Sequence, residues 1–343
     1  ASLACLPRCG AGTADSLLAM TMFITPSEEV AKRDSKEVSL FSLSKYVWVL
    51  CLLPAAAATA ASFPRVQAVP LPEGRCAFEV EGGAVAVHHA RSGSPRPFVF
   101  PLLGPAGRRL TAMTHPTDPV GHRHHRSIWV AHHDVDGVDF WGDDPGARIV
   151  ERGIEAFESG ATRARLTTRN EWLTPDGKGI LEERRTLILE ALDDEEYYLD
   201  VVLLLTPVAE TVTLGKTPFG FLGVRVAPTI AVRGGGRARS AQGDEDEAGV
   251  HWQRSRWVDY SGRITPQQRN GVAVFDHPEN PRFPTYFHLR DDGWVGAAFC
   301  YEKAYPLARE APLALHYRIY AHGDRDAETI QRHWQRFAEM TLE

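Results

Sequence analysis

The sequence predicts an all-β protein, a large antiparallel β-sandwich with one C-terminal helix. Two observations support this fold class. From residue 77 onward, short runs rich in Val, Leu, Ile, Thr and Tyr are separated by Gly, Pro and Asp, which is typical of strands joined by turns. Helix-type spacing of apolar residues is almost absent until residue 326.

Four segments are strand candidates: residues 161–170, 180–189, 197–205 and 313–320. The run Pro175-Asp176-Gly177-Lys178-Gly179 separates the first two, and its turn chemistry predicts a hairpin. In the last segment, Leu313, Leu315, Tyr317 and Ile319 alternate with Ala314, His316, Arg318 and Tyr320. This alternation predicts one buried and one wetter face.

The end of the chain predicts the helix. Asp326 can cap a helix that carries Ile330, Trp334 and Phe337 on one face. The acidic, glycine-flanked stretch 234–249 has no apolar periodicity, and we expect a mobile loop there.

Composition bounds the domain organisation and the partners. The 343 residues are 43% hydrophobic and 24% charged, and they contain no repeat of 20 to 50 residues, so we expect a single sandwich domain over residues 62–343. The net charge is −6 with acidic and basic residues interleaved, which argues against a nucleic-acid partner.

The N-terminal segment, residues 1–61, has the parts of a signal peptide. Lys45 precedes the apolar run 46–53, and an alanine-rich tract follows Pro54. The alternative is a membrane anchor, but the run is shorter than the ~20 residues that span a bilayer. We therefore expect cleavage near Ala60 or Ala61, a secreted or periplasmic protein, and no part for this segment in the fold.

Two of the five cysteines, Cys76 and Cys300, follow the predicted cleavage point. In an oxidising compartment they could form one disulfide, and two buried free thiols are an equal alternative.

A histidine cluster locates the candidate site. Residues 121–126 (GHRHHR) and 132–141 (HHDVDGVDFW) hold five of the fourteen histidines. On a strand, His122 and His124 would project to one face, with Arg123 and His125 on the other. This spacing suits two ligands of one metal, or an acid with an orienting partner. The alternative is a polar rim in which the histidines bind backbone and acidic neighbours.

The second half of this cluster allows two further interpretations. Residues 134–139 superficially resemble a calcium loop but lack its later Glu. Phe140 and Trp141 follow, and an exposed Trp beside carboxylates can stack on a sugar ring; core packing is the alternative.

Two later segments repeat the mixture of aromatic, acidic and basic residues. Trp257 and Asp259 belong to the first, and the proline-rich second segment presents His277, Asn280 and Arg282 on a rigid loop. Three glutamates, Glu171, Glu182 and Glu183, are candidates for a general base, although neighbouring arginines also fit a salt-bridged strand face. No nucleophile elbow, phosphate-binding glycine loop or zinc helix is present in the sequence.

Together, the motifs at 122–126, 132–141, 257–262 and 276–282 resemble the bacterial family of unknown function labelled "methane oxygenase PmoA-like", over about residue 98 to the end. The family pattern more often has Pro at Arg123, Gly at Ser127 and His133, and Asn at Asp136. The label does not supply the function, because a methane-oxidising membrane subunit has several membrane-spanning helices and this sequence has none after its signal segment. The resemblance implies a β-rich protein akin to the galactose-mutarotase-like supersandwich, in bacteria that degrade polysaccharides.

The leading hypothesis is a carbohydrate-active enzyme that performs hydrolysis, elimination or epimerisation. His122, His124 or His125 would be the general acid, and Glu171 or Glu183 the base. The candidate substrate-binding residues are Arg126, His132, Asp139, Trp141, Trp257, Asp259, His277, Asn280 and Arg282.

Two alternatives stay open. One is a metal-dependent hydrolase in which His122, His124 and His277 hold Zn²⁺ or another divalent ion such as Ca²⁺; apart from that ion, no cofactor is expected. The other is a non-catalytic glycan-binding module.

Overall fold

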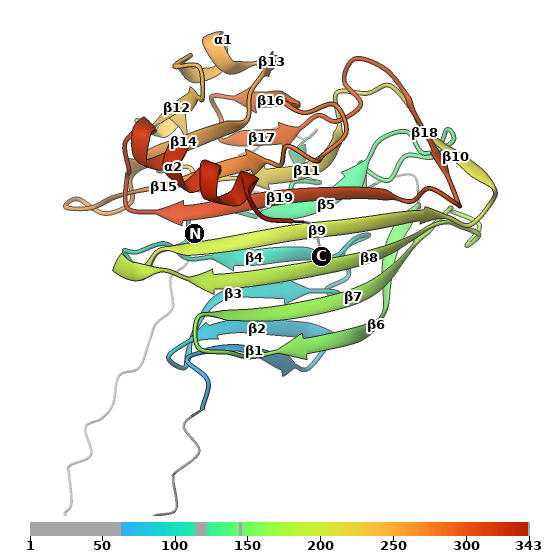
Figure 1. Cartoon of the computed structure of the whole chain (residues 1–343), viewed down its shortest axis with the longest axis horizontal. Helices are drawn as coiled ribbons and strands as arrows, with labels where there is room; N and C mark the ends of the chain where they lie inside the picture. Colours follow the sequence, from blue (N-terminus) through green and yellow to red (C-terminus); the bar gives the residue numbers. More distant parts are fainter. Residues whose placement is uncertain (1–62, 114–121, 144–145, 342–343) are drawn as a thin grey trace, which may run out of the picture. The chain divides into compact units, whose positions relative to one another are not determined.

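The computed structural model describes residues 63–113, 122–143 and 146–341. Residues 60–343 form one compact unit, in which two antiparallel sheets pack face to face (Figure 1). The predicted all-β sandwich with one C-terminal helix is confirmed. The predicted signal segment, with its cleavage point, lies outside the described residues.

The first sheet has nine strands in the order β1-β2-β3-β4-β5-β11-β17-β16-β13. Their bounds are β1 Val66–Leu71, β2 Arg75–Val80, β3 Gly83–His89, β4 Phe98–Leu102, β5 Ile128–His132, β11 Gly220–Arg225, β17 Trp294–Ala297, β16 Tyr286–Arg290 and β13 Gln253–Arg254.

The second sheet has eight strands in the order β12-β14-β15-β19-β9-β8-β7-β6. Their bounds are β12 Arg237–Ser240, β14 Trp257–Arg263, β15 Arg269–Asp276, β19 Leu313–His322, β9 Tyr197–Pro207, β8 Gly179–Ala191, β7 Arg163–Leu173 and β6 Arg148–Glu158. A separate pair, β10 (Thr211–Leu214) and β18 (Tyr305–Ala308), completes the strands, and the short 3-10 turns are η2 Asp193–Glu195 and η3 Val232–Gly234.

The core lies between the two sheets. Alternate residues of each strand face it, including Val130 and Leu222 of the first sheet and Leu166, Leu187 and Leu203 of the second, all at most 3% exposed. The residues between them on each strand therefore point to the two outer faces of the sandwich, and the cavity described below lies on the outer face of the first sheet.

All four predicted strands are present, as β7, β8, β9 and β19. The predicted turn joins β7 to β8: the backbone N–H of Gly177 donates to the Thr174 carbonyl at 2.9 Å, and Gly177 has a φ of 85°. A left-handed backbone of this kind favours glycine, which is why the sequence signalled the hairpin correctly.

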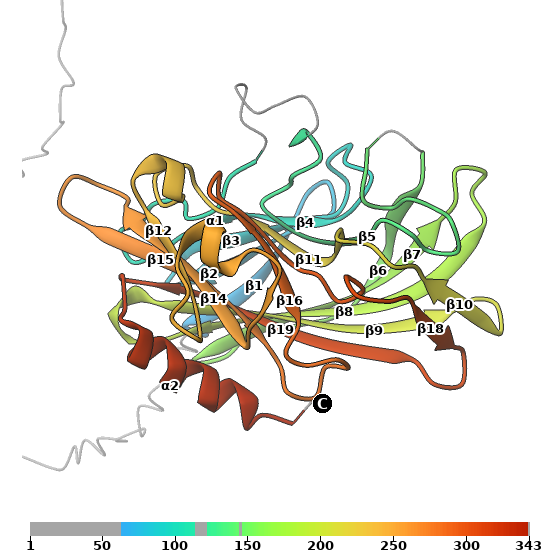
Figure 2. The same cartoon turned by 90° about the horizontal axis from the view of Figure 1, so that it is seen from above.

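The predicted wetter face of β19 is wrong. His316, Arg318 and Tyr320 are at most 3% exposed, because helix α2 (Ala327–Ala338) packs over this face (Figure 2). The helix itself matches its prediction: the Asp326 side chain accepts the Thr329 N–H at 2.7 Å, and Ile330 and Phe337 are buried. Among the described residues, no helix combines the length and apolar character that crossing a membrane requires.

The expected mobile loop at 234–249 is instead ordered structure that contains β12 and the short helix α1 (Asp246–Val250). Two of its glycines are packing positions: a Cβ on Gly234 or Gly236 would lie about 2 Å from the carbonyl oxygens of Pro228 and Ile230. Glycine allows this close approach of two backbone segments. The glycine content of the stretch therefore reflects close packing, although it had suggested a mobile loop.

Cys76 on β2 and Cys300 after β17 are buried free thiols. Of the two alternatives left open by the sequence, the structure has the free thiols.

Candidate functional site

Two indole rings cover part of the outer face of the first sheet. Trp129 of β5 and Trp294 of β17 lie 5.1 Å apart between ring centroids, on either side of Gly223 in β11. A Cβ on Gly223 would lie 2.9 Å from the Trp129 ring and 2.8 Å from the Trp294 ring. Gly296, the partner of Gly223 across the strands, leaves similar room for Trp294. The two glycines therefore let the two indoles pack closely, tilted by 32° to each other, as an aromatic floor in which Trp294 lines the pocket.

A loop after β5 supplies Trp141 as one wall above this floor. The Asp139 carboxylate accepts the backbone N–H groups of Trp141 at 2.7 Å and Gly142 at 3.1 Å. Buried Arg96 donates to the carbonyls of Phe140 and Gly142, at 2.7 and 3.2 Å. These bonds on both sides of Trp141 fix its indole 5.4 Å from both Trp129 and Trp294, between centroids.

The predicted histidines form a turn and not a strand. The His125 N–H donates to the His122 carbonyl at 3.2 Å, and β5 begins only at Ile128. As a result, the rings of His122 and His125 stack at 5.2 Å, and His122, His124 and His125 all line one pocket, so the expected separation of His125 from the other two is wrong. His125 also stacks on Trp294, while His124 accepts a hydrogen bond at 3.0 Å from the Trp141 indole N–H.

Together these parts enclose a cavity of about 420 Å³, within the size range of small-molecule sites. We call it the histidine pocket. It is lined by His122, His124, His125, His133, Asp139, Trp141, Gly142, Phe219, His288, Arg290 and Trp294. Figure 2 shows the loops around residues 122–143 on the side of the first sheet that faces away from the second.

The buried imidazoles of the pocket are neutral at pH 7. Burial, with nearby Arg96, lowers the pKa of His124 to about 4, and burial, with nearby His251, lowers that of His288 to about 3. Burial also lowers the pKa of His125 strongly, and neighbouring His124 adds to the effect. Desolvation disfavours the charged ring in each case, so these side chains act as neutral hydrogen-bonding groups.

Two other histidines have carboxylate partners. His133 Nδ1 lies 3.1 Å from Asp139 Oδ1 at the open side of the pocket, where the His133 side chain is 47% exposed. His122 Nδ1 lies 3.7 Å from Asp292 Oδ2. Although burial opposes ionisation of Asp292, Arg225 and Arg290 lower its pKa, so this carboxylate stays charged. A carboxylate orients an imidazole and stabilises its protonated form.

The two predicted catalytic glutamates lie elsewhere. Glu183 faces the core with no exposed surface, and its carboxylate accepts from Trp172, Asn170 and Arg185. Glu171 lies on the outer face of β7, where Arg152 holds it at 2.7 Å, and Glu182 is exposed on β8. The structure brings none of the three to the histidine pocket.

Of the predicted substrate-binding residues, Asp139 and Trp141 line the pocket, whereas Arg126 and His132 are not among its lining residues. Arg126 donates to Asp143 at 2.7 Å, and Asp143 also pairs with Arg96. His132 is fully buried and hydrogen-bonds the Gly215 carbonyl at 3.0 Å.

Trp257 and Asp259 are structural residues of the second sheet. The Trp257 indole donates to Gln331 of α2 at 2.9 Å. Asp259 is fully buried and bonds His322 at 2.9 Å and Arg239 at 3.0 Å. Their polar groups are therefore already paired inside the fold.

The rigid loop at 276–282 also has structural contacts. His277 Nε2 bonds the Met340 carbonyl, and the Asn280 amide donates to Asp276 and to the His316 carbonyl, both at 2.7 Å. Arg282 donates to the carbonyls of Lys303 and Ala304. The loop packs against α2 and β19 and does not line the histidine pocket.

The metal set expected from the sequence is not brought together. His277 stacks on His316 of the second sheet, whereas His122 and His124 line the histidine pocket. Within residues 63–113, 122–143 and 146–341, no group of three or more His, Cys, Asp or Glu side chains is arranged to hold a metal ion.

The proposed calcium loop is a β-turn whose carboxylates each bind backbone. Asp134 accepts the Gly137 N–H, Asp136 accepts the Thr213 N–H, and Asp139 is engaged as described above. The three carboxylates thus hold three different backbone segments and do not converge on one point.

Sequence reasoning missed the β16–β17 hairpin, which supplies His288, Arg290, Asp292 and Trp294. A signal was present: His288 and Arg290 alternate with apolar Phe287 and Leu289, as expected for a strand with one polar face. The hairpin lies far along the chain from the histidine cluster, so nothing in the sequence indicated that the two come together in one pocket.

Comparison with known proteins gives a family but no activity. The model described as "Family of unknown function (DUF6807)" matches residues 75–335. No curated protein matches the chain.

Two similar solved structures are the heparan sulfate lyase HepC from Pedobacter heparinus and a mutant of it, both 10% identical to this chain. The mutant gives a TM-score of 0.40 over 77% of this chain and 37% of its own length, and the other structure 0.39 over 74% and 36%. The chain thus spans little more than a third of these structures, and a likeness this distant says nothing about its activity.

Proposed function

Because the chain belongs to the DUF6807 family, a family of unknown function, we propose its activity from the site alone: a carbohydrate-active enzyme whose histidine pocket transfers protons on a sugar. The predicted membership of an uncharacterised family is confirmed, under a description other than the PmoA-like label. The observation that carries the proposal is the His133–Asp139 pair at the open side of a pocket with Trp141 and Trp294 in its walls.

The lining of the pocket suits a ring with one apolar face and several hydroxyl groups. The Trp141 and Trp294 indoles offer flat apolar surface, while the neutral imidazoles of His124, His125 and His288 add polar nitrogens without a net charge. Such a mixture disfavours a purely apolar ligand, which would leave the buried Nδ1 of His288 without a hydrogen-bond partner. A sugar satisfies both kinds of surface.

The acid–base step rests on His133. With Asp139 Oδ1 at 3.1 Å from Nδ1, a proton held on Nδ1 would leave Nε2 to accept one from the substrate. In an elimination, Nε2 takes the proton from a ring carbon, the C–O bond to the leaving group breaks, and the imidazolium returns the proton to the leaving oxygen. In an epimerisation, the carbon takes a proton from its opposite face and the imidazolium releases its own proton to solvent. In a hydrolysis, Nε2 takes a proton from water as the water oxygen bonds to the sugar carbon, the C–O bond to the leaving group breaks, and the imidazolium gives the proton to the leaving oxygen. Arg290, across the pocket, would stabilise the developing negative charge.

The test uses chromatographic product detection on a panel of neutral and acidic oligosaccharides. On the substrate found, we expect His133→Ala to lower kcat about 100-fold or more with little change in KM. Asp139→Asn should lower kcat by less and should also weaken the Trp141 wall. His89→Gln, which replaces a half-buried histidine of β3 outside the pocket, is the matched control and should keep full activity. Full turnover by His133→Ala would overturn the proposal.

A glycan-binding module is the second candidate. One observation favours it: Asp139, the carboxylate of the pocket lining, already accepts two backbone N–H groups and forms an ion pair with His133, so it offers little to a substrate. Saturable binding by calorimetry, abolished in Trp141→Ala and without any product in the chromatographic assay, would select binding over catalysis.

A further inference from the structure

One imidazole of the histidine pocket has its ring proton assigned by its neighbour. The Trp141 indole N–H donates to His124 Nε2 at 3.0 Å. An indole nitrogen only donates, so His124 Nε2 is the acceptor and carries no proton. A neutral imidazole has one ring proton, and this hydrogen bond assigns it to Nδ1. His124 is therefore a hydrogen-bond donor through Nδ1.

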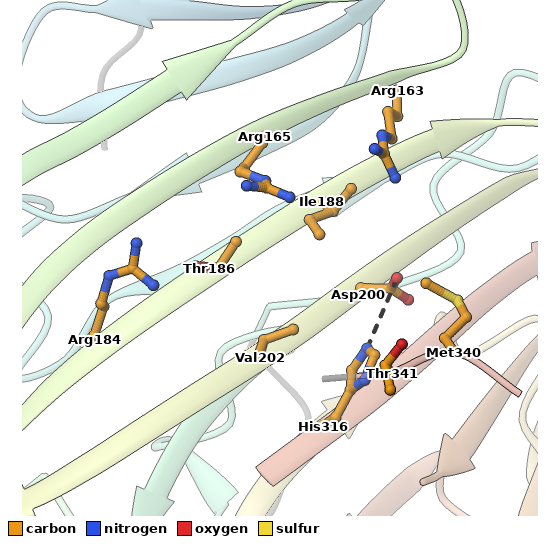
Figure 3. Close-up of a pocket in the computed structure, with 10 residues that line it drawn as sticks. All are labelled: Arg163, Arg165, Arg184, Thr186, Ile188, Asp200, Val202, His316, Met340 and Thr341. Carbon is orange, nitrogen blue, oxygen red and sulfur yellow. Dashed lines mark ion pairs between the residues drawn. The ribbon is translucent and has the colours of Figure 1, made fainter. Parts of the chain in front are cut away.

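Other partners of histidine differ in what they assign. Nε2 of His316 lies 3.8 Å from Asp200 Oδ2 on the second sheet (Figure 3). A carboxylate accepts from a neutral or a charged imidazole alike, so such a pair assigns no tautomer. The Phe100 carbonyl, in contrast, accepts from Nε2 of His89 at 2.7 Å, and burial lowers the pKa of His89, so that this neutral ring carries its proton on Nε2. His89 and His124 thus have opposite tautomers.

The direction of the His124 donor is fixed by the packing of the ring. Trp141 is 4% exposed, and hydrogen bonds on both sides of it hold its indole in place. The His125 ring packs edge-on against His124, at 4.6 Å between centroids. His124 lines the histidine pocket, and among the described residues its Nδ1 has no hydrogen-bond partner. Nδ1 is also not sealed from solvent, so a ligand in the pocket can reach it.

The donor carries no charge, and the charged groups of the pocket are paired. Burial lowers the pKa of His124 to about 4, so the ring is neutral at pH 7. Arg290 forms an ion pair with Asp292 at 3.9 Å. Asp139 forms one with His133 at 3.1 Å. A carboxylate on the ligand would compete with Asp292 for Arg290, whereas an uncharged oxygen accepts the Nδ1–H bond and leaves both ion pairs intact.

We propose that His124 is a specificity-determining residue of the histidine pocket: Trp141 locks it in the Nδ1–H tautomer, and this donor selects an uncharged acceptor oxygen of the ligand. The ligand class is a neutral sugar, which presents a hydroxyl, ring or carbonyl oxygen to Nδ1–H. The tautomer lock does not depend on any ligand, whereas the ligand class rests on the proposed function. Separate measurements therefore test the two parts.

Long-range proton–nitrogen correlation spectra of the isotope-labelled full chain at pH 7 test the lock. We expect a protonated Nδ1 for His124 and the opposite pattern for His89. Trp141→Phe keeps an aromatic wall but removes the indole donor, so a second population with the proton on Nε2 should appear. Trp252→Phe is the matched control, because it changes an indole beside His288 and should leave the His124 pattern unchanged. A proton on His124 Nε2 in the wild type, or no change in Trp141→Phe, would overturn the proposal.

Calorimetric titration with glucose, glucuronate, galactose and galacturonate tests the ligand class. We expect at least one neutral sugar to bind, and its uronate to bind at least about tenfold more weakly. Uronates that bind as tightly as the neutral sugars, or no binding by any of the four, would overturn the selection. Binding without turnover would refute the proposed acid–base step of His133 and would support this inference.

Substitutions at His124 decide whether its donor is responsible. His124→Leu removes the donor and should weaken binding of the neutral sugar about tenfold. His124→Asn places an amide N–H near the Nδ1 position and should keep most of the affinity. His89→Gln is again the control and should bind like the wild type. Unchanged melting temperatures verify folding, and equal affinities of His124→Leu and His124→Asn would overturn the role of the donor.

Discussion

Gly223 is the residue on which the aromatic floor of the histidine pocket depends. Both indoles that it separates are almost completely buried, and neither can tilt without disturbing Trp141. An added methyl group would be too close to both rings, at 2.8 and 2.9 Å. The absence of a side chain here is thus as necessary to the pocket as the histidines above it.

Gly223→Ala should therefore lower the free energy of unfolding by about 1–3 kcal/mol and change the near-ultraviolet circular dichroism of the tryptophans. Gly153→Ala in β6 is the matched control, because a Cβ there meets nothing within 4 Å. Chemical denaturation of both variants measures the difference. Equal stability of the two variants would contradict the close packing described at Gly223.

His288 should make stability depend on pH. Its pKa is about 3 in the folded chain, lowered by burial, against about 6.5 in an unfolded chain. Between these values the unfolded chain binds more protons, so stability is full above pH 6.5 and is lost as the pH falls. By pH 5 the loss is on the order of 2 kcal/mol. Denaturation of wild type and His288→Gln at pH 7 and 5 checks this: the variant should lose less stability than wild type, and parallel losses would contradict it.

At the residue scale, the density of titratable groups in the sequence pointed to His122, His124 and His125, which the structure brings to one pocket. Their part in a reaction stays a prediction. The error at Glu171 and Glu183 has a physical cause: adjacent strand positions face opposite sides, and a carboxylate can end up on a solvated face or sealed in the core. Only the register of β7 and β8 shows which glutamate faces solvent and which faces the core.

At the scale of elements, helix α2 buries the outer face of β19. Phe337 is fully buried against His277, His316 and Arg318, so the helix turns a face that alternation marked as wet into a second small core. The amphipathic pattern predicted the helix, but not the strand that it would cover. The periodicity of a segment shows which of its residues are apolar, but it does not show which distant element packs against that segment.

Phe337→Ala should destabilise the chain by about 3–5 kcal/mol, because it leaves a cavity beneath α2. Glu328→Ala, on the exposed side of the same helix, removes one surface ion pair with Arg332 and should cost about 0.5 kcal/mol or less. Urea denaturation compares the two. A loss below about 1 kcal/mol for Phe337→Ala would show that α2 does not stabilise the sheet.

On the scale of the whole described unit, one continuous core separates the outer faces of the two sheets, and the histidine pocket is on the outer face of the first sheet. The fold class followed from the spacing of strand-type runs and from the turn residues between them. The sequence could not reveal the whole histidine pocket, because His288, Arg290 and Trp294 come from a hairpin far along the chain from the histidine turn.

One core shared by both sheets predicts cooperative unfolding, and the two buried thiols report it. Burial raises the pKa of Cys76 and of Cys300 to about 12, so the reactive thiolate is scarce in the folded chain. In native buffer, iodoacetamide should label neither residue until the whole unit unfolds, and both should then react with one rate constant. Peptide mass spectrometry at these two positions follows the reaction, and digestion without reductant should yield no linked Cys76–Cys300 peptide. Fast labelling of one thiol alone would show that the sheets open separately.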